Sequence, residues 1–304
     1  MARESQTAAG MLKSKPSKGD RAFDVVNAII MALVCVIIIY PMYYVVLASI
    51  TDPKIVNTGK LLLYPEAPYF GGYQKALEYP ALWSGYRNTI QYTLMSVVVS
   101  LVTTIPCAYS LSRADLVGRR PLMFLFTFTM FFSGGIIPMY ITIRELNIYN
   151  TAWALVLPAA VSVYNLIVCR SFFDTSIPRE LLEASKIDGC TDFGFFFRIA
   201  LPISSTIIAV MALFYATSMW NTFFNALMFL QDDSKMPLQV ILRNLVLSNQ
   251  LSQGASGAEL AEKQRIIDQL KYVIITVSAL PLIIMYPFVQ KYFAAGVTIG
   301  AVKG

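Results

Sequence analysis

Ser176-Ile-Pro-Arg-Glu-Leu-Leu-Glu-Ala-Ser-Lys-Ile-Asp-Gly189 is a polar, helix-prone stretch that separates two long apolar runs. Nine charged residues fall between Arg170 and Arg198, whereas the flanking runs, residues 150–169 and 199–230, contain none. A polar insert between two hydrophobic spans is expected to lie in water at a membrane face. The alternation of apolar runs with this insert therefore predicts a membrane protein.

Composition supports the same conclusion. The chain has 304 residues, of which 56% are hydrophobic and only 14% are charged, against about 25% charged residues in a soluble domain. The net charge of +6 does not indicate nucleic-acid binding, because the basic residues gather in the N-terminal tail and in loops beside apolar runs, as the positive-inside rule predicts.

Catalytic and metal sites are not expected. The sequence has no histidine, which is the commonest general base and metal ligand. Its four cysteines do not have the spacing of a metal site or of a disulfide framework. We therefore predict neither catalytic residues nor a metal centre.

Six runs are long enough to span a bilayer, which takes about 20 apolar residues. The predicted spans are residues 25–50, 88–112, 121–143, 150–169, 199–230 and 272–290, and none of them contains Asp, Glu, Lys or Arg. Several contain proline, so the backbone groups that proline frees must be satisfied by neighbouring helices. The expected fold is an all-α, polytopic bundle, in which the 32-residue fifth run is tilted, kinked or extended beyond the lipid.

The basic residues predict the orientation. Residues 1–24 form a basic tail with five Lys or Arg, and the loop at residues 113–120 has three. With six spans in a transmembrane domain at 25–293, these segments, the polar insert and the tail at 294–304 all lie on one side, which the positive-inside rule makes cytoplasmic. On the other side, Leu238, Ile241, Leu242 and Leu245 have the spacing of an amphipathic helix over residues 236–246.

The polar insert is expected to form a helix, a turn and a second short helix. Ser176 can cap the first helix and Pro178 is tolerated in its first turn. Gly189 suits a left-handed C-terminal cap, and Thr191 or Asp192 can begin the second helix. Small side chains at positions 184 and 185 would allow another protein to approach closely.

The spacing within the insert resembles a known motif. Glu183-Ala184-Ser185, Gly189 and Ile199-x-Leu201-Pro202 match the E-A-A-x3-G-x9-I-x-L-P pattern of the EAA loop in ABC importer permeases. The loop would cover residues 174–202, and Ser185 in place of the second alanine is the one departure. The alternative is an ordinary surface helix with a glycine cap, for which the extended spacing would be a coincidence.

Further stretches extend the resemblance to about residues 20–304. Trp220-Asn-Thr-Phe223, Met236-Pro-Leu-Gln239 and the C-terminal residues 290–304 resemble sugar permeases. The chain is thus similar to the maltose-type (type I) carbohydrate permeases, in particular to those for oligosaccharides and polysaccharides in Gram-positive bacteria. The resemblance implies the type I importer fold in a bacterial cell membrane.

The resemblance also implies function and partners. Glu183, Ala184, Ser185, Asp188 and Gly189 would couple the permease to a cytoplasmic ATPase, with Glu183 meeting a basic group. The chain lacks a G-x-x-x-x-G-K-[ST] motif, so ATP and Mg²⁺ would be bound by two ATPase subunits and this chain would bind no cofactor. A second, homologous permease chain and an extracytoplasmic, lipid-anchored substrate-binding protein would complete the importer.

Polar residues inside the spans are candidates for the substrate pathway, because amides in a membrane are costly unless they are partnered. The candidates are Tyr164, Asn165, Tyr215, Trp220, Asn221 and Asn225. Asn221 and Asn225 would share one helix face, directed toward the pathway or bonded to a neighbouring helix. Trp220 has a second interpretation, as an interfacial anchor or a packing residue.

Other functions stay open. The cargo could be a peptide or a lipid-derived molecule instead of a sugar. An ion-coupled secondary transporter is expected to have charged residues within its spans, and the six runs have none. A membrane scaffold protein would need no coupling motif, and co-purification with an ATPase would distinguish it from a permease.

Overall fold

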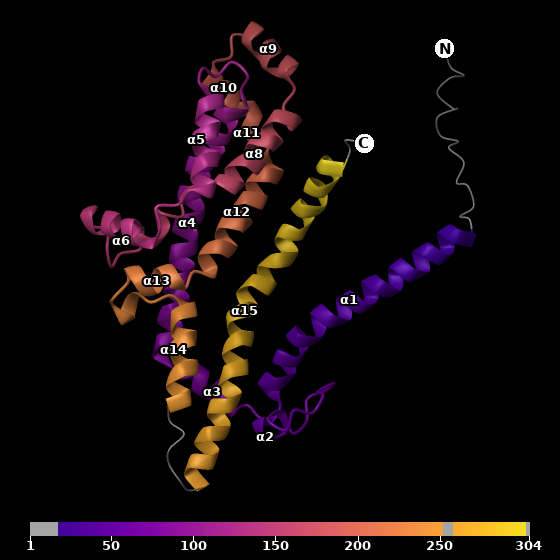
Figure 1. Cartoon of the computed structure of the whole chain (residues 1–304), viewed down its shortest axis with the longest axis vertical. Helices are drawn as coiled ribbons and strands as arrows, with labels where there is room; N and C mark the ends of the chain where they lie inside the picture. The colour runs from indigo at the N-terminus through magenta and orange to yellow at the C-terminus, as the bar shows by residue number, and fades with distance from the viewer. Residues whose placement is uncertain (1–17, 252–257, 302–304) are drawn as a thin grey trace. The chain divides into compact units, whose positions relative to one another are not determined.

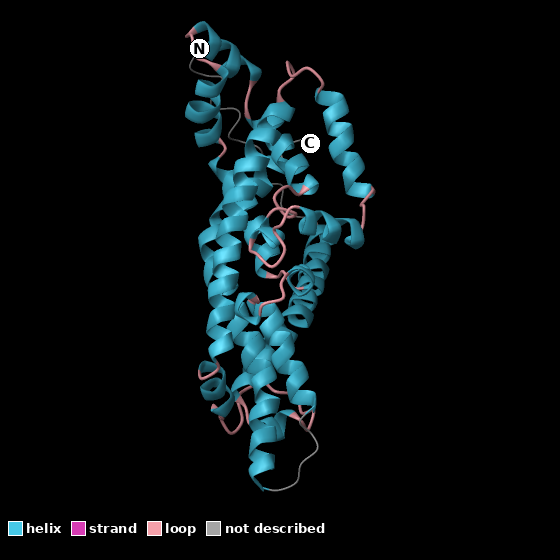
Figure 2. Ribbon diagram, turned by 90° about the vertical axis from the view of Figure 1, so that its left-hand side faces the viewer, coloured by secondary structure: helices cyan, strands magenta, loops and turns pink. Residues whose placement is uncertain are grey.

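The computed structural model describes residues 18–251 and 258–301. The chain divides into two compact units, Met1–Tyr69 and Phe70–Gly304. The described residues of both units form helices and loops (Figures 1 and 2), and the β-structure among them is limited to one isolated bridge between Thr51 and Pro68. The predicted all-helical architecture is therefore confirmed for the part of the chain that is described.

The first unit consists of a long helix, α1 (Lys18–Ile50), a short helix, α2 (Pro53–Val56), and a loop that folds back on the end of α1. The apolar side chains of α1 are exposed from Phe23 to Ile39, as expected for a helix surrounded by lipid. At its end, the Tyr43 hydroxyl donates to the Leu63 carbonyl (2.8 Å) and the Tyr69 amide donates to the Ile50 carbonyl (2.8 Å). The helix begins seven residues before the predicted span at 25–50.

The second unit holds the remaining helices. In chain order they are α3 (Gly71–Leu77), α4 (Pro80–Ser112), α5 (Arg119–Phe131), α6 (Ile136–Glu145), α7 (Trp153–Val156), α8 (Val163–Ser176), α9 (Arg179–Ile187), α10 (Asp192–Phe195), the π-helix η2 (Phe196–Ala200), α11 (Leu201–Ile203), α12 (Ser205–Trp220), α13 (Phe224–Phe229), the 3₁₀ helix η3 (Asp233–Lys235), α14 (Leu238–Leu251) and α15 (Ala258–Ala301). Helices α9 and α10 lie at one end of this unit, and α3 and α14 lie at the other (Figure 1).

Helix α4 is the central element of the second unit, because α7, α8, α12 and α14 all pack on it. A buried stripe of small or hydroxyl side chains recurs at helical spacing along it: Gly85, Thr89, Thr93, Ser96, Ser100, Thr104 and Ala108. A Cβ atom added to Gly85 would lie 3.2 Å from the Leu238 Cα atom of α14. Such small residues let helices approach closely inside a membrane.

Two of the predicted spans are sharply bent. The run at 121–143 forms α5 and α6, which meet at 113°, and the run at 199–230 contains a 78° bend at Ser204. At the first bend Gly135 has φ +85° and ψ −177°, a backbone conformation that only glycine adopts readily. In the fifth run, the 78° bend at Ser204 corresponds to the kink among the three expected alternatives of tilt, kink and extension.

The run at 150–169 is not one continuous helix, contrary to the prediction. It is interrupted between α7 and α8, where Pro158 lacks a backbone N–H and the Ser162 side chain caps α8 by accepting from the Asn165 amide (3.4 Å). Hydroxyl groups of α4 satisfy the freed carbonyls: Ser100 donates to Ala159 (3.4 Å) and Thr103 donates to Ala160 (3.0 Å). A neighbouring helix thus satisfies two of the backbone carbonyls that the break after Pro158 leaves without a helical partner.

Three described helices are long and apolar enough to cross a membrane: Gly19–Ile50, Pro80–Ser112 and Gln264–Met285. The number rises to five if each of the two bent pairs is one span. The last of these spans lies within α15, which continues to Ala301, through most of the predicted tail at 294–304.

The far end of the second unit matches its predicted pattern. Helix α14 covers residues 238–246 of the predicted amphipathic stretch at 236–246 and begins two residues later than that stretch, with Leu238, Ile241 and Leu242 buried. Helix α15 is tied to α3 through Gln269, whose side-chain oxygen accepts from the Gly72 amide (2.7 Å).

Candidate functional site

The polar insert folds as the helix, turn and short helix that its sequence predicts. Helix α9 ends in a double hydrogen bond in which the Gly189 amide donates to Lys186 (3.1 Å) and the Cys190 amide donates to Ser185 (2.9 Å). Gly189 has φ +74°, so this is a Schellman cap, which favours glycine. The Thr191 side chain then caps α10 by accepting from the Gly194 amide (3.1 Å).

Ser176 does not cap α9, contrary to the prediction. It is the last residue of α8, and the N-cap of α9 is Pro178, which makes no side-chain cap bond. Helix α8 extends seven residues beyond the apolar run, and on this extension Arg170 and Asp174, one turn apart, pair at 3.8 Å.

The motif residues lie on two sides of α9. Glu183, Ala184 and Asp188 are exposed, together with Ile187, whose side chain is 87% exposed. Ser185 is buried, and its hydroxyl donates to the Leu182 carbonyl (2.7 Å). The predicted small-residue surface therefore includes Ala184 but not Ser185, because Ser185 faces the rest of this chain.

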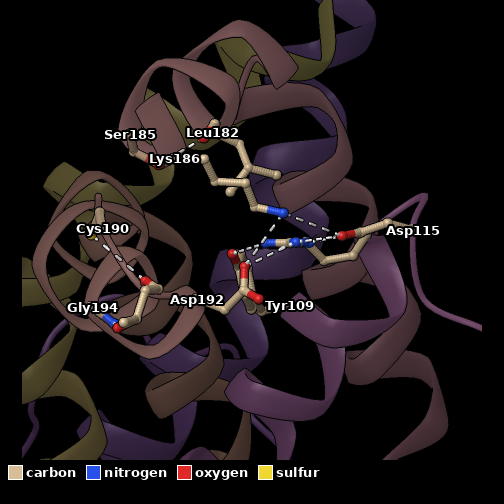
Figure 3. A network of polar contacts seen from close by, with 10 residues as sticks. Tyr109, Asp115, Leu182, Ser185, Lys186, Cys190, Asp192 and Gly194 are labelled. Carbon is tan, nitrogen blue, oxygen red and sulfur yellow. Dashed lines mark hydrogen bonds and ion pairs between the residues drawn. The ribbon is translucent and has the colours of Figure 1, made fainter. Parts of the chain in front are cut away.

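A cluster of four charged residues lies beneath α9 (Figure 3). The Arg113 guanidinium, at the end of α4, donates from Nε to Asp115 (2.8 Å) and lies 3.1 Å from the Asp192 carboxylate of α10. The Lys186 ammonium of α9 lies 3.9 Å from both carboxylates. We call Arg113, Asp115, Lys186 and Asp192 the charge cluster; its two positive and two negative groups balance.

The charge cluster shifts the ionisation of its members. The hydrogen bond from Arg113 lowers the pKa of Asp115 from 3.8 to about 2. The same bond raises the pKa of Arg113 above its ordinary value. Asp115 is consequently charged at any physiological pH.

Asp115→Asn is expected to flatten the acid dependence of stability. A carboxylate with a lowered pKa stabilises the fold fully above its unfolded value of 3.8, and the stabilisation is lost as the pH falls through about 2. The difference in thermal midpoint between wild type and variant, measured in detergent from pH 6 to pH 2, should be constant at first and then shrink below about pH 4. A difference that stays constant down to pH 2 would contradict the role of this pair.

Two adjoining pockets between α8 and α12 gather four of the six pathway candidates. Tyr164, Asn165 and Asn221 line one of about 680 Å³. Asn165 also lines a second pocket of about 350 Å³, together with Tyr215 and Ser162. Asn165 is largely buried, so its amide is positioned at the boundary of both pockets. Thr217 and Ser218 add hydroxyl groups to the wall.

The hydroxyl of Tyr215 has structural partners. It lies 2.7 Å from the Thr104 hydroxyl of α4 and accepts from the Ser162 amide at the start of α8 (3.2 Å). Tyr215 is buried. The tyrosine therefore joins three segments, and its ring is what it contributes to the pocket wall.

Tyr215→Phe is expected to lower the free energy of unfolding by about 1–2 kcal/mol, because it leaves a buried hydroxyl and a backbone amide without their shared partner. Thermal denaturation in detergent measures the change, with the exposed Tyr164→Phe as the matched control. Unchanged stability with impaired transport would instead indicate that the Tyr215 hydroxyl contacts the cargo.

The other two candidates lie elsewhere. Trp220 is buried in an apolar cluster with Leu82, Leu238 and Val273, in agreement with the packing interpretation. Asn221 and Asn225 do not share a helix face, contrary to the prediction, since α12 ends at Trp220 and α13 begins at Phe224. The Asn221 side chain donates to the Thr217 carbonyl (2.8 Å). It thereby competes with backbone N–H groups for a carbonyl at the end of α12.

Sequence reasoning missed Arg113, Asp115 and the hydroxyl stripe on α4. The stripe was detectable, because Ser or Thr recurs every three or four residues within the run at 88–112, at positions 89, 93, 96, 100 and 104. No comparable signal marks the charge cluster, whose members come from separate segments. Within the described ranges, no group of three or more His, Cys, Asp or Glu side chains could hold a metal ion.

The long apolar helices place the chain in the class of helical membrane proteins, and comparisons identify the family. The chain belongs to the family described as "Binding-protein-dependent transport system inner membrane component", which it matches over residues 79–299. Membership makes it a membrane-embedded permease component, a non-catalytic subunit that works with ATPase and substrate-binding partners.

Individual relatives cover nearly the whole chain. It is 39% identical to the polygalacturonan/rhamnogalacturonan transport system permease protein YtcP of Bacillus subtilis (strain 168), over 90% of this chain and 94% of that one. It is 37% identical to Protein LplC of the same organism, over 95% and 97%.

A solved structure also matches. The chain is similar to a bacterial ABC transporter involved in the import of the acidic polysaccharide alginate, with 32% identity and a TM-score of 0.80. The match covers 91% of this chain and 98% of that one. The similarity extends the type I importer resemblance from the motif to the arrangement of the helices.

Proposed function

We propose that this chain forms half of the translocation pathway of an ATP-driven importer for an oligosaccharide or polysaccharide fragment that contains uronic acid. The observation that carries the proposal is similarity along nearly the whole chain to a polygalacturonan/rhamnogalacturonan permease and to an alginate importer. The chain is also 27% identical, over 90% of its length, to the arabinooligosaccharides transport system permease protein AraQ of Halalkalibacterium halodurans.

The chain crosses the cell membrane six times, with both termini in the cytoplasm. The three long apolar helices and the two bent pairs support five crossings, and the interrupted segment from α7 to α8 supplies the sixth. The basic residues of the 1–24 tail and of the 113–120 loop support the orientation.

Helix α9 is the coupling helix that docks on a cytoplasmic ATPase. Glu183, Ala184, Asp188 and Gly189 are exposed and present an acidic, small-residue surface, which suits a cleft with a basic group. Ser185 acts from the inner side by allowing close contact with the rest of the chain. ATP and Mg²⁺ are bound by two ATPase subunits.

The cargo passes along the two pockets between α8 and α12. Sugars are recognised by hydrogen bonds to amides and hydroxyls and by contact with aromatic faces. Asn165, Asn221 and Tyr164 supply these groups, whereas Trp220 and Tyr215 hold the surrounding helices. Asn225, the remaining pathway candidate, is exposed on α13 and does not line either pocket.

The membrane part of the importer is a heterodimer of this chain and a homologous permease. A lipid-anchored extracytoplasmic binding protein delivers the substrate to it. Uptake by the reconstituted complex tests the proposal, with radiolabelled oligomers of galacturonate, alginate and arabinan as probes. We expect ATP-dependent uptake of one or both uronate oligomers. Uptake of arabinan alone would overturn the uronate assignment, and uptake of none of the three would overturn the oligosaccharide assignment.

A further inference from the structure

We propose that Arg113 is a positioning residue that holds α9 and α10 on the end of α4, so that movement of the coupling helix is transmitted to α4. The inference rests on the proposed function, because it presupposes that an ATPase docks on α9. It assigns a role to a residue outside the EAA loop, on a different helix of the chain.

The contacts of Arg113 join three segments, whose contacting residues Tyr109, Asp115 and Asp192 are labelled in Figure 3. Its guanidinium donates to Asp115 in the following loop (2.8 Å), pairs with Asp192 of α10 (3.1 Å) and donates to the Tyr109 hydroxyl of α4 (3.1 Å). The side chain is only 13% exposed. The rigid fork of guanidinium donors can hold several partners in one geometry, which a lysine ammonium cannot do.

Lys186 adds α9 to the same cluster. Its ammonium lies 3.9 Å from the carboxylates of Asp115 and Asp192, on the side of α9 that also carries Leu182 (Figure 3). Leu181 and Leu182 are partly buried against the apolar core beneath. Helix α9 is thus joined to the end of α4 by apolar packing and by the charge cluster.

Beneath the charge cluster, aromatic packing makes the junction stiff. The Tyr109 ring is buried against Phe173 of α8 (5.6 Å between centroids) and Phe196 of η2 (4.9 Å). Close-packed side chains of this kind transmit displacement instead of absorbing it. A shift of α9 and α10 is therefore expected to move the end of α4.

Helix α4 also reaches the pockets between α8 and α12, which are the proposed sugar pathway. Helix α4 is continuous from Pro80 to Ser112, so Thr104 lies about 14 Å from Arg113 at 1.5 Å per residue. The Thr104 hydroxyl contacts Tyr215, and Thr103 donates to Ala160 beside the smaller pocket. Helix α4 consequently has the charge cluster at its end and contacts the pocket wall about two and a half turns earlier, at Thr103 and Thr104.

Two variants test this role in the fully assembled importer, reconstituted with its ATPase and binding-protein partners. The readout is the amount of radiolabelled oligogalacturonate imported per ATP hydrolysed. Arg113→Ala is expected to lower this ratio about tenfold, within the usual range of coupling between sites, while the ATPase still co-purifies. Arg113→Lys should restore part of the ratio, because it keeps the charge but loses the fork.

The matched control is Asp174→Asn. It removes ion pairs to Arg119 and Arg170 (3.6 and 3.8 Å) near the same end of the unit, but Asp174 has no ion pair to α9 or α10 among the described residues. Its import ratio should equal that of the wild type. A fall as large as that of Arg113→Ala would overturn the inference, because any charge in the region would then have the same effect.

Asp192→Asn covers the case in which Arg113→Ala fails to fold. Asp192 is 65% exposed, so this change, which removes its ion pairs to Arg113 and to Lys186, should have little effect on stability. A lowered ratio is expected. If the wild-type complex imports the sugar and Asp192→Asn has the same ratio of import to ATP hydrolysis, the role of Arg113 is overturned. The proposed function would be unaffected by that result. A wild type in which no ATPase co-purifies overturns the proposed function, and with it this inference.

Discussion

Glu183→Ala is expected to lower sugar uptake roughly 30-fold or more, the effect of removing one partner from a buried charge pair at an interface. Glu183 is exposed on α9, and no ion pair to it occurs in the described part of the chain. Its carboxylate is thus available to a partner, and its removal should not disturb the fold. Uptake into vesicles and the amount of membrane-inserted protein are the two measurements.

The matched control for this variant is Glu180→Ala. Glu180 carries the same charge on the same helix, but it lies in the first turn and outside the E-A-A pattern. Most of the uptake should survive its loss. Normal uptake by Glu183→Ala, with the ATPase still bound, would remove the coupling role from this residue.

Phe173→Ala is expected to lower the free energy of unfolding by about 3–5 kcal/mol, the usual cost of removing a fully buried phenylalanine. Phe173 is 2% exposed and makes an edge contact with Tyr109 beneath the charge cluster. The cavity would open where α4, α8 and α10 meet. Thermal denaturation of the purified protein in detergent measures the loss.

Phe193→Ala provides the comparison. Phe193 lies on α10, two residues before the buried Phe195, but its own side chain is 79% exposed. Its replacement should leave the thermal midpoint nearly unchanged. Equal destabilisation by the two variants would show that the aromatic junction does not carry the stability assigned to it.

Local signals predicted the polar insert well. The left-handed Gly189 and the Thr191 cap are decided by a few neighbouring residues, so the sequence contains the information needed to place them. The inward orientation of Ser185 was not predictable in this way, because it depends on what packs against α9. The amphipathic face of α14 was predicted because its leucines follow helical spacing.

The helix interruptions were harder to predict. Apolar runs at 121–143 and 150–169 indicate membrane segments but do not say where the backbone turns. The break before α8 is stable because Ser100, Thr103 and Tyr215, from two other helices, satisfy its backbone groups. These hydrogen bonds are tertiary contacts, and a hydropathy pattern does not predict tertiary contacts. The charge cluster was missed for the same reason, since Arg113 and Asp192 are far apart in the chain.

The Schellman turn at Gly189 keeps α9 and α10 within one short, contiguous segment, which has a consequence for engineering. The surface offered to an ATPase lies within residues 177–200. A chimaera that exchanges these residues with those of a relative would therefore transfer the preference for a particular ATPase. This segment also depends on residues outside it, however, because Asp192 pairs with Arg113 and Lys186 pairs with Asp115. A functional exchange would therefore have to bring the donor's residues at the end of α4 along with it.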